Sequence, residues 1–162
     1  MTGATTSDVD ARMLQQAVDL ATANVAVGGG PFGALVVRDG AVVATGVNRV
    51  TLDLDPTAHA EVTAIRAACR ELGVFALTGC TLYTSCEPCP MCAASSLWAR
   101  LDRVVFCANR DDAADGGFDD RAFYELLTTA PGSWPTAVQE LRLESAGSPF
   151  RAWRDNPVRV DY

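Results

Sequence analysis

A single histidine and a pair of cysteines place the strongest constraint on how this chain folds. His59 is the only histidine in 162 residues, and Cys89 and Cys92 follow in the segment PCPMC at residues 88–92. One imidazole and two thiolates are good ligands for zinc, and three protein ligands leave the fourth tetrahedral position open to water. The fold must therefore bring residue 59 and residues 89–92 together at one ion.

The acidic residue Glu61 favours an open, reactive zinc site over a sealed one. It stands two positions after His59, where an acid/base beside the metal is needed. An open zinc lowers the pKa of its bound water from about 15.7 to about 7, which makes hydroxide available at neutral pH. In one alternative Cys86 is a fourth ligand that closes the site, and in another the Cys-x-x-Cys segment serves redox exchange. Neither alternative has a use for the carboxylate of Glu61.

Length and charge indicate one domain, residues 1–162, that acts on a small molecule. The chain is 49% hydrophobic and 20% charged, with a net charge of −7, which is ordinary for a soluble globular protein. Nucleic-acid binding relies on lysine and arginine contacts to phosphates, so this balance argues against a polynucleotide partner. No signal peptide is evident, and no apolar run reaches the roughly 18 residues of a membrane span. We therefore expect a cytoplasmic protein with no membrane partner and a weakly charged or uncharged substrate.

The hydrophobic pattern predicts strands interleaved with helices. An apolar stripe predicts a first helix that ends at the Gly-Gly-Gly-Pro segment, residues 28–31. Asp39-Gly40 is a strong two-residue hairpin signal between strand-like runs at residues 32–38 and 41–47. Three more strands are predicted, at residues 81–85, 103–107 and 137–143.

The predicted helices place the candidate ligands at helix N-termini. Asp55 and Pro56 predict the start of a helix that ends at Gly73. Cys89 is the expected cap of the next helix, and the helix dipole there favours thiolate over thiol. Residues 121–127 and a segment beginning at residue 148 are predicted helices, and residues 109–120 a loop. The expected fold is an α/β three-layer α-β-α sandwich, with metal ligands on two helix N-termini that meet across the sheet.

The segments around the candidate ligands resemble those of a known enzyme superfamily. PTAHAEVTAIR (residues 56–66) and TSCEPCPMC (84–92) carry the pattern H-x-E…P-C-x-x-C, which is the signature of zinc deaminases of nucleobases. They look like the bacterial guanine deaminases of the cytidine-deaminase-like superfamily. Nearly the whole chain takes part, except residues 126–134; further matches are GGPFGA (29–34), GFDD (117–120), SPFRAWR (148–154) and Tyr162.

The resemblance implies a fold, an assembly and a set of site residues. The fold would be a five-stranded mixed sheet between helices, in a homodimer that exchanges its C-terminal segments, about residues 145–162, so that each tail covers the neighbour's site. One zinc ion per chain would be bound by His59, Cys89 and Cys92. Glu61 would be the proton carrier and Asp120 a second catalytic acid. Substrate binding is assigned by resemblance to Phe32, Asn48, Ala60, Trp98 and Tyr162.

Several of these assignments have structural alternatives. Asn48 also suits a left-handed turn after the second strand, and Phe32 and Trp98 also suit a plain core. Asp119 and Asp120 look like caps for the helix near residue 121, and Asp119 can cap while Asp120 faces the pocket. A residue at an extreme terminus, such as Tyr162, is ordinarily frayed.

The implied reaction is the hydrolytic loss of an exocyclic amine, which converts guanine to xanthine and ammonia. Glu61 takes a proton from the zinc-activated water, and the hydroxide attacks the ring carbon that bears the amine. Glu61 then carries protons to the ring nitrogen and to the leaving ammonia. Rival substrates are guanosine, cytosine and a triazine; a tRNA adenosine deaminase uses the same motif, but the acidic balance disfavours it. The alternative from another functional class is a non-catalytic zinc or redox module. An assay for ammonia release distinguishes a deaminase from such a module.

Overall fold

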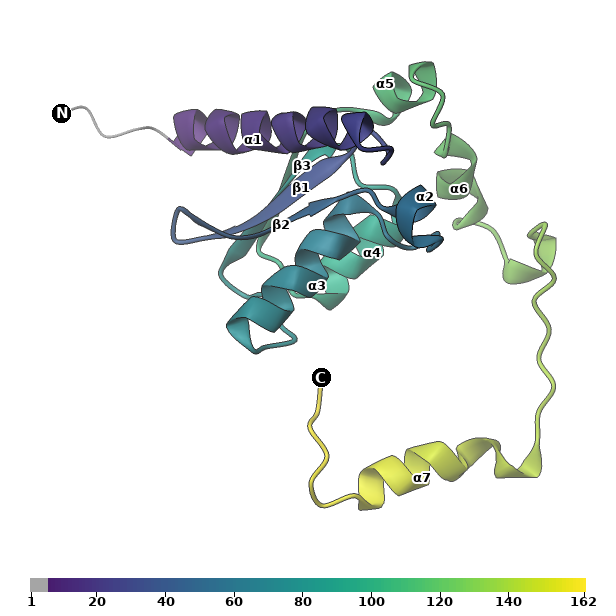
Figure 1. The fold of residues 1–162 in the computed structure, drawn as a ribbon. Helices are drawn as coiled ribbons and strands as arrows, with labels where there is room; N and C mark the ends of the chain where they lie inside the picture. The colour runs from purple at the N-terminus through teal and green to yellow at the C-terminus, as the bar shows by residue number, and fades with distance from the viewer. Residues whose placement is uncertain (1–5) are drawn as a thin grey trace. The chain divides into compact units, whose positions relative to one another are not determined.

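The structure, a computed structural model, describes residues 6–162 and divides the chain into two compact units, Met1–Tyr124 and Glu125–Tyr162. The first unit holds one β-sheet with helices on both faces, as Figure 1 shows. The second unit holds helix α7 (Ser148–Asp155) and two single-turn 3₁₀ helices, Pro131–Ser133 and Glu144–Gly147. Within residues 6–162, no helix is both long enough and apolar enough to cross a membrane.

One mixed sheet of four strands forms the centre of the first unit. In spatial order the strands are β2 (Ala41–Val47), β1 (Gly33–Arg38), β3 (Cys80–Cys86) and β4 (Arg103–Ala108). Strand β1 is antiparallel to both neighbours, whereas β3 and β4 are parallel. Asp39 and Gly40 both have positive φ, 51° and 77°, as a tight hairpin turn requires. The hairpin prediction and the first four predicted strands are therefore confirmed.

Strand β1 is buried on both faces, which explains the layered architecture. Ala34 and Val36 belong to a core cluster shared with helix α3 (Ala60–Leu72). Leu35 and Val37 pack on the opposite face with helix α1 (Thr6–Ala26). Successive side chains of a strand point to opposite faces, so an apolar run needs cover on both sides. Helix α4 (Pro90–Trp98) lies beside α3 (Figure 1), so the layers are α1, the sheet, and the α3–α4 pair.

Two glycines allow the helices to lie close to the sheet. A Cβ on Gly46 in β2 would be 2.3 Å from the carbonyl oxygen of Ala60 and 2.4 Å from the amide nitrogen of Ala64. A Cβ on Gly33 in β1 would be 2.4 Å from the carbonyl oxygen of Ala17 in α1. No side chain fits at either position. The first turn of α3 is therefore held directly against the backbone of β2.

The predicted fifth strand at residues 137–143 is wrong. The sheet has four strands, and residues 137–143 form no strand in the structure. A strand needs a neighbour for its backbone groups and cover for its apolar face. Here the apolar positions are exposed, with Leu141 at 86% of its full accessibility. This segment therefore lacks the partner that would make it a strand.

Several helices differ from the predictions. Helix α3 begins at Ala60 and not at Asp55, because the Asp55 carboxylate accepts hydrogen bonds from the N–H and hydroxyl of Thr57 (2.8 and 2.7 Å) and so forms a separate turn. Its predicted end at Gly73, φ 66°, is confirmed. The predicted loop at 109–120 contains helix α5, whose capping box joins Asn109 and Asp112. Helix α5 spans Arg110–Asp115. Helix α2 (Val50–Asp53) was not predicted, whereas helix α6 (Arg121–Leu126) was.

Candidate metal centre and substrate cavity

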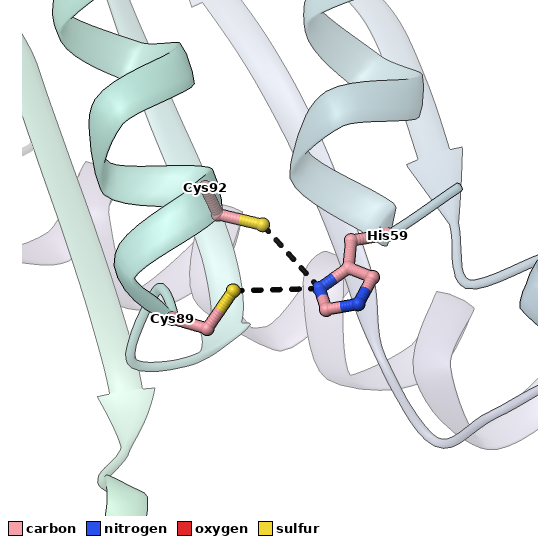
Figure 2. Close-up of side chains that lie close together, drawn as sticks. All are labelled: His59, Cys89 and Cys92. Carbon is pink, nitrogen blue, oxygen red and sulfur yellow. Dashed lines mark hydrogen bonds between the residues drawn. The ribbon is translucent and has the colours of Figure 1, made fainter. Parts of the chain in front are cut away.

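The three predicted metal ligands lie together at the N-terminal ends of two helices, as Figure 2 shows. His59 is the N-cap of α3, Cys89 is the N-cap of α4, and Cys92 lies in the first turn of α4. The Nδ1 atom of His59 is 3.6 Å from Sγ of Cys89 and 3.5 Å from Sγ of Cys92. The two helices lie side by side on one face of the sheet. The prediction that the ligands meet across the sheet is therefore wrong.

The spacing of the ligand atoms fits tetrahedral zinc. Zinc–sulfur bonds of about 2.3 Å and zinc–nitrogen bonds of about 2.0–2.1 Å at tetrahedral angles separate nitrogen from sulfur by about 3.6 Å. The observed separations of 3.5 and 3.6 Å agree with this. All three ligand atoms lie within 4.8 Å of one another. His59, Cys89 and Cys92 are therefore suited to hold zinc, whose chemistry when bound is to activate a water molecule.

Cys86 lies outside this cluster. Its thiol donates a hydrogen bond to the carbonyl oxygen of Asn109 at 3.6 Å. Burial raises the pKa of Cys86 to about 11, so the thiol stays neutral at physiological pH. The group with metal-ligand spacing contains His59, Cys89 and Cys92 without Cys86. This geometry agrees with the open site and not with the sealed site of four ligands.

The surroundings of Cys89, at the N-cap of α4, favour its thiolate form. A hydrogen bond from the Cys92 thiol is the main cause that lowers the pKa of Cys89 to about 4, and His59 lowers it further. The same hydrogen bond raises the pKa of Cys92. Thiolate sulfur is the form that binds metal, and a helix N-terminus favours it.

Glu61 places a carboxyl group beside the metal ligands. It lies in the first turn of α3, and only 6% of the residue is exposed. Burial is the main cause that raises the pKa of Glu61 to about 7. A carboxyl group whose pKa is near neutral can both accept and return a proton during a reaction. Glu61 therefore has the position and the acidity that the predicted proton carrier needs.

An open cavity of about 840 Å³ lies against the metal ligands, within the first unit. This volume falls in the usual range for small-molecule sites. The cavity brings together six of the predicted site residues: Phe32, Asn48, His59, Glu61, Cys89 and Asp120. The ring of Phe32 meets that of Phe118 edge to face, with centroids 5.1 Å apart, and both rings line the cavity. Phe32 also packs against the core, so it is both a core residue and a residue of the cavity wall.

Asn48 is held at the cavity by its surroundings. Its Oδ1 accepts a hydrogen bond from the N–H of Val50 at 3.3 Å, so its NH₂ group is the part left to meet a ligand. The side chain of Asn24 donates to the carbonyl oxygens of Asn48 and Gly30, each at 2.8 Å. A Cβ on Gly30 would be 2.9 Å from Asn48 Oδ1. Asn48 does not have positive φ, so the alternative of a left-handed turn residue is wrong.

The two neighbouring acids near residue 121 differ in their contacts. The carboxylate of Asp119 accepts a hydrogen bond from the N–H of Arg121 at 3.2 Å and also pairs with its guanidinium. Asp120 lines the cavity, and partial burial raises its pKa. Asp119 therefore binds the first residue of α6, Arg121, and both Asp119 and Asp120 line the cavity.

Three predicted substrate-binding residues lie elsewhere. Ala60 is fully buried in the core and does not line the cavity. Trp98 is 67% exposed at the end of α4, with the guanidinium of Arg100 5.7 Å from its ring, so the alternative of a core residue is wrong. Tyr162 belongs to the second unit, where its ring lies 6.0 Å from that of Trp153. Their roles toward substrate stay predictions.

Sequence reasoning missed an ion pair at the cavity. Arg110 and Glu87 both line it, and Nε of Arg110 is 3.1 Å from Oε2 of Glu87. No local pattern marks this pair, because the residues are 23 positions apart. The one available signal is topological, since Glu87 follows β3 directly and Arg110 lies two residues after the parallel strand β4.

Comparison with known proteins assigns the family. Residues 7–108 match the family described as the cytidine and deoxycytidylate deaminase zinc-binding region. The chain therefore belongs to this family of zinc-binding deaminases, and its α/β fold is cytidine-deaminase-like.

Guanine deaminase of Bacillus subtilis matches most of the chain, and a tRNA-specific adenosine deaminase matches about half of it. Guanine deaminase of Bacillus subtilis (strain 168) is 48% identical over 150 residues, which are 92% of this chain and 96% of that protein. A crystal structure of B. subtilis guanine deaminase is similar with a TM-score of 0.91 and 47% identity, covering 94% of this chain and 98% of that one. A tRNA-specific adenosine deaminase of Aquifex aeolicus is 44% identical over 78 residues, 48% of this chain and 52% of that protein.

Structures with bound nucleobase analogues are also similar. The protein NE0047 has been solved in complex with 2,6-diaminopurine, at 36% identity and a TM-score of 0.65 over 68% of this chain and 62% of that chain. A mutant of NE0047 has been solved with 8-azaguanine, at a TM-score of 0.66 over 69% of this chain and 65% of that one.

Proposed function

We propose that this protein catalyses the hydrolytic deamination of guanine to xanthine and ammonia, with one zinc ion per chain. The observation that carries the proposal is the spacing of His59, Cys89 and Cys92 beside the buried carboxyl group of Glu61. A relative of nearly the same length, 48% identical, is a guanine deaminase, which supports guanine as the substrate.

The side chains of the cavity divide the work of the reaction. Zinc held by His59, Cys89 and Cys92 supplies the activation of water. Glu61 accepts the proton of the attacking water and then returns protons to the ring nitrogen and to the departing amine. General acid/base transfer of this kind contributes about 10²–10⁴-fold to rate. Asp120 binds the amine and takes part with Glu61 in the proton transfers.

Asn48 and Asp120 give the cavity its preference for guanine. The NH₂ group of Asn48 donates to the purine carbonyl oxygen, and Asp120 accepts from the exocyclic amine. Because buried polar groups are left unpaired by a ring that lacks these partners, such sites can separate substrates by roughly 10⁴–10⁵. Phe32 and Phe118 provide the aromatic surface against which a flat ring packs.

An ammonia assay over guanine, guanosine, adenine, cytosine, cytidine and ammeline tests this function. We expect guanine to be turned over far faster than adenine or cytosine. A higher kcat/KM for guanosine would support the first rival and would mean that the cavity admits the sugar. Protein that contains zinc and releases ammonia from none of these compounds would support the non-catalytic alternative.

We also propose that the protein is a homodimer that exchanges its C-terminal segments within an otherwise single domain. None of the residues of the second unit is buried, and a unit of this size is not stable without a core. Its apolar side chains therefore need another surface. The first unit exposes apolar side chains on α4 and β4 that a second copy can cover: Leu97, Trp98, Val104 and Phe106.

Complementation between two inactive variants tests the exchange. One chain carries Glu61→Gln, and the other lacks residues 160–162, which include Tyr162. In a mixed dimer with exchanged tails, one cavity has an intact Glu61 and is covered by the intact tail of the other chain. We expect activity to return after subunit exchange. Absence of recovery, when mixed dimers are confirmed by differently tagged chains, would argue against exchanged tails.

All six cysteines are free, which suits the reducing cytoplasm that we propose for this protein. Fractionation of cells that express the tagged chain tests the location.

A further inference from the structure

The backbone that leads into Cys89 is held by the side chain of a distant residue. The hydroxyl of Tyr124, in helix α6, donates a hydrogen bond to the carbonyl oxygen of Pro88 at 2.8 Å. Pro88 precedes the metal ligand Cys89 directly. The peptide group that joins Pro88 to Cys89 is therefore anchored from outside its own loop, 36 positions along the chain.

Arg110 in turn holds the ring of Tyr124. The guanidinium carbon of Arg110 lies 3.7 Å from the centroid of that ring, which is a close cation–π contact. Burial is the main cause that raises the pKa of Tyr124 to about 12, so its hydroxyl keeps the proton that it donates. The arginine therefore fixes the plane of the ring, and the ring fixes the direction of the hydroxyl.

Glu87 completes the arrangement. Its Oε2 accepts from Nε and from the backbone N–H of Arg110, each at 3.1 Å, while its Oε1 pairs with the Nη2 atom of the same guanidinium. The N–H of Glu87 donates to the carbonyl oxygen of Ala108 at 2.8 Å. Two-pronged arginine–carboxylate pairs of this kind fix geometry as well as charge.

These contacts form a closed ring of four residues: Glu87 to Arg110, Arg110 to Tyr124, Tyr124 to Pro88, and Pro88 back to Glu87 through the chain. Two consecutive residues just before Cys89 are thus tied to the segment that follows β4. The fit of the cluster to zinc depends on where Sγ of Cys89 stands relative to Nδ1 of His59, 3.6 Å away. A loop free to move would lose that separation.

We infer that Arg110 and Tyr124 are positioning residues that hold the loop of Cys89 in the geometry zinc requires. The inference rests on the zinc site of the proposed function. Arg110 and Tyr124 act through the backbone of Glu87 and Pro88 and do not themselves ligate the metal. Residues that orient metal ligands affect how well a metal is retained, even when no ligand is altered.

Tyr124→Phe is the sharpest test, because it removes one hydroxyl and leaves the ring beneath the guanidinium. The matched control is Tyr83→Phe, since the hydroxyl of Tyr83 also donates a hydrogen bond, to Asp10 at 2.6 Å, on the α1 side of the sheet. The measurement is the rate at which zinc-loaded protein loses zinc to an excess of a colorimetric chelator. Thermal unfolding of each variant is measured alongside.

We expect Tyr124→Phe to lose zinc about 3- to 10-fold faster than the parent, as the loss of one hydrogen bond predicts. Tyr83→Phe should lose zinc at the parental rate even if it unfolds at a lower temperature. Arg110→Gln should accelerate the loss further, because it removes the ion pair and the cation–π contact together. Arg110→Lys should fall between the parent and Arg110→Gln, since lysine keeps the charge without the planar fork.

The outcomes separate this inference from the proposed function. If the parent holds zinc and deaminates guanine, and Tyr124→Phe and Arg110→Gln release zinc at the parental rate, the inference alone is overturned. Equal acceleration by Tyr83→Phe would also overturn it, because the effect would then follow from general destabilisation. A raised KM for guanine in Arg110→Gln with unchanged zinc loss would mean that Arg110 contacts substrate instead. A parent that retains no zinc would overturn both proposals.

Discussion

The substitution Gly46→Ala tests whether the contact between β2 and α3 sets the geometry of the metal centre. The added Cβ would be 2.3 Å from the carbonyl oxygen of Ala60 and 2.4 Å from the amide nitrogen of Ala64, whereas ordinary contacts begin at 3.4 Å. Both neighbours are backbone atoms of a helix, so no side chain can rotate away. The first turn of α3 must therefore move outward by about 1 Å, and His59 and Glu61 move with it.

The size of the effect follows from that displacement. Overpacking of a core of this kind costs about 1–3 kcal/mol in the free energy of unfolding. For a chain of this length each kcal/mol lowers the Tm by about 2–4 °C. A misplacement of about 1 Å in a reacting group can reduce the rate by about 10²-fold. We therefore expect a modest fall in the Tm together with a large fall in kcat/KM for guanine.

Two control variants separate stability from site geometry. Gly33→Ala creates an equally close contact, 2.4 Å from the carbonyl oxygen of Ala17, but it displaces α1 on the other face of the sheet. Gly132→Ala has no atom within 4 Å of its new Cβ. Calorimetry and guanine turnover are measured for all three variants. We expect Gly33→Ala to lose stability with a smaller loss of activity, and Gly132→Ala to match the parent.

A Gly46→Ala protein that is destabilised as expected but keeps kcat/KM within a few-fold of the parent would refute the reasoning. In that case the contact between α3 and β2 serves packing alone. An unchanged Tm would refute the steric argument itself.

Three further changes have defined outcomes. Glu61→Gln should abolish guanine turnover while zinc content, measured by elemental analysis, stays at the parental level, because the amide keeps the shape but cannot carry a proton; turnover near the parental rate would identify another base. Deletion of residues 160–162 should remove most of the activity without lowering the Tm, and a fully active truncated protein would rule out a lid role for Tyr162. Asn24→Ala removes the hydrogen bonds to the carbonyl oxygens of Gly30 and Asn48, and leaving these oxygens unpaired costs about 1–3 kcal/mol in the free energy of unfolding. Steady-state kinetics should show a higher KM for guanine. An unchanged KM would mean that Asn48 is positioned without Asn24.

The metal ligands could be predicted from sequence because their chemistry is restrictive. Few residue types bind zinc, and only one histidine was available. Pro90 immediately after Cys89 marked a helix start, and the structure has Cys89 as N-cap with proline following. The Asp39-Gly40 hairpin was predictable for a similar reason, since few sequences tolerate two consecutive residues with positive φ.

Other features depended on contacts that no local pattern records. The apolar residues at 137–143 are compatible with a strand, but the sequence carries no information about whether a neighbouring edge is available. Asp55-Pro56 marks a helix start and a turn equally well, and the side chain of Thr57 decided between them. The pair of Glu87 and Arg110 arises because two parallel strands end side by side, which is a property of the sheet.

The charge around the cavity has a consequence for which purines can enter. Among the residues that the structure describes, Arg110 is the only arginine or lysine that lines the cavity, and its guanidinium is already paired with Glu87 and stacked on Tyr124. The lining also carries carboxyl groups, from Glu61, Glu87, Asp119 and Asp120. A phosphate group brought here meets like charge at close range with no unpaired guanidinium to receive it. Guanine nucleotides, although they carry the same ring, should therefore neither react nor compete with guanine at this site. The charge of the cavity thus excludes the phosphorylated forms independently of the contacts that recognise the ring.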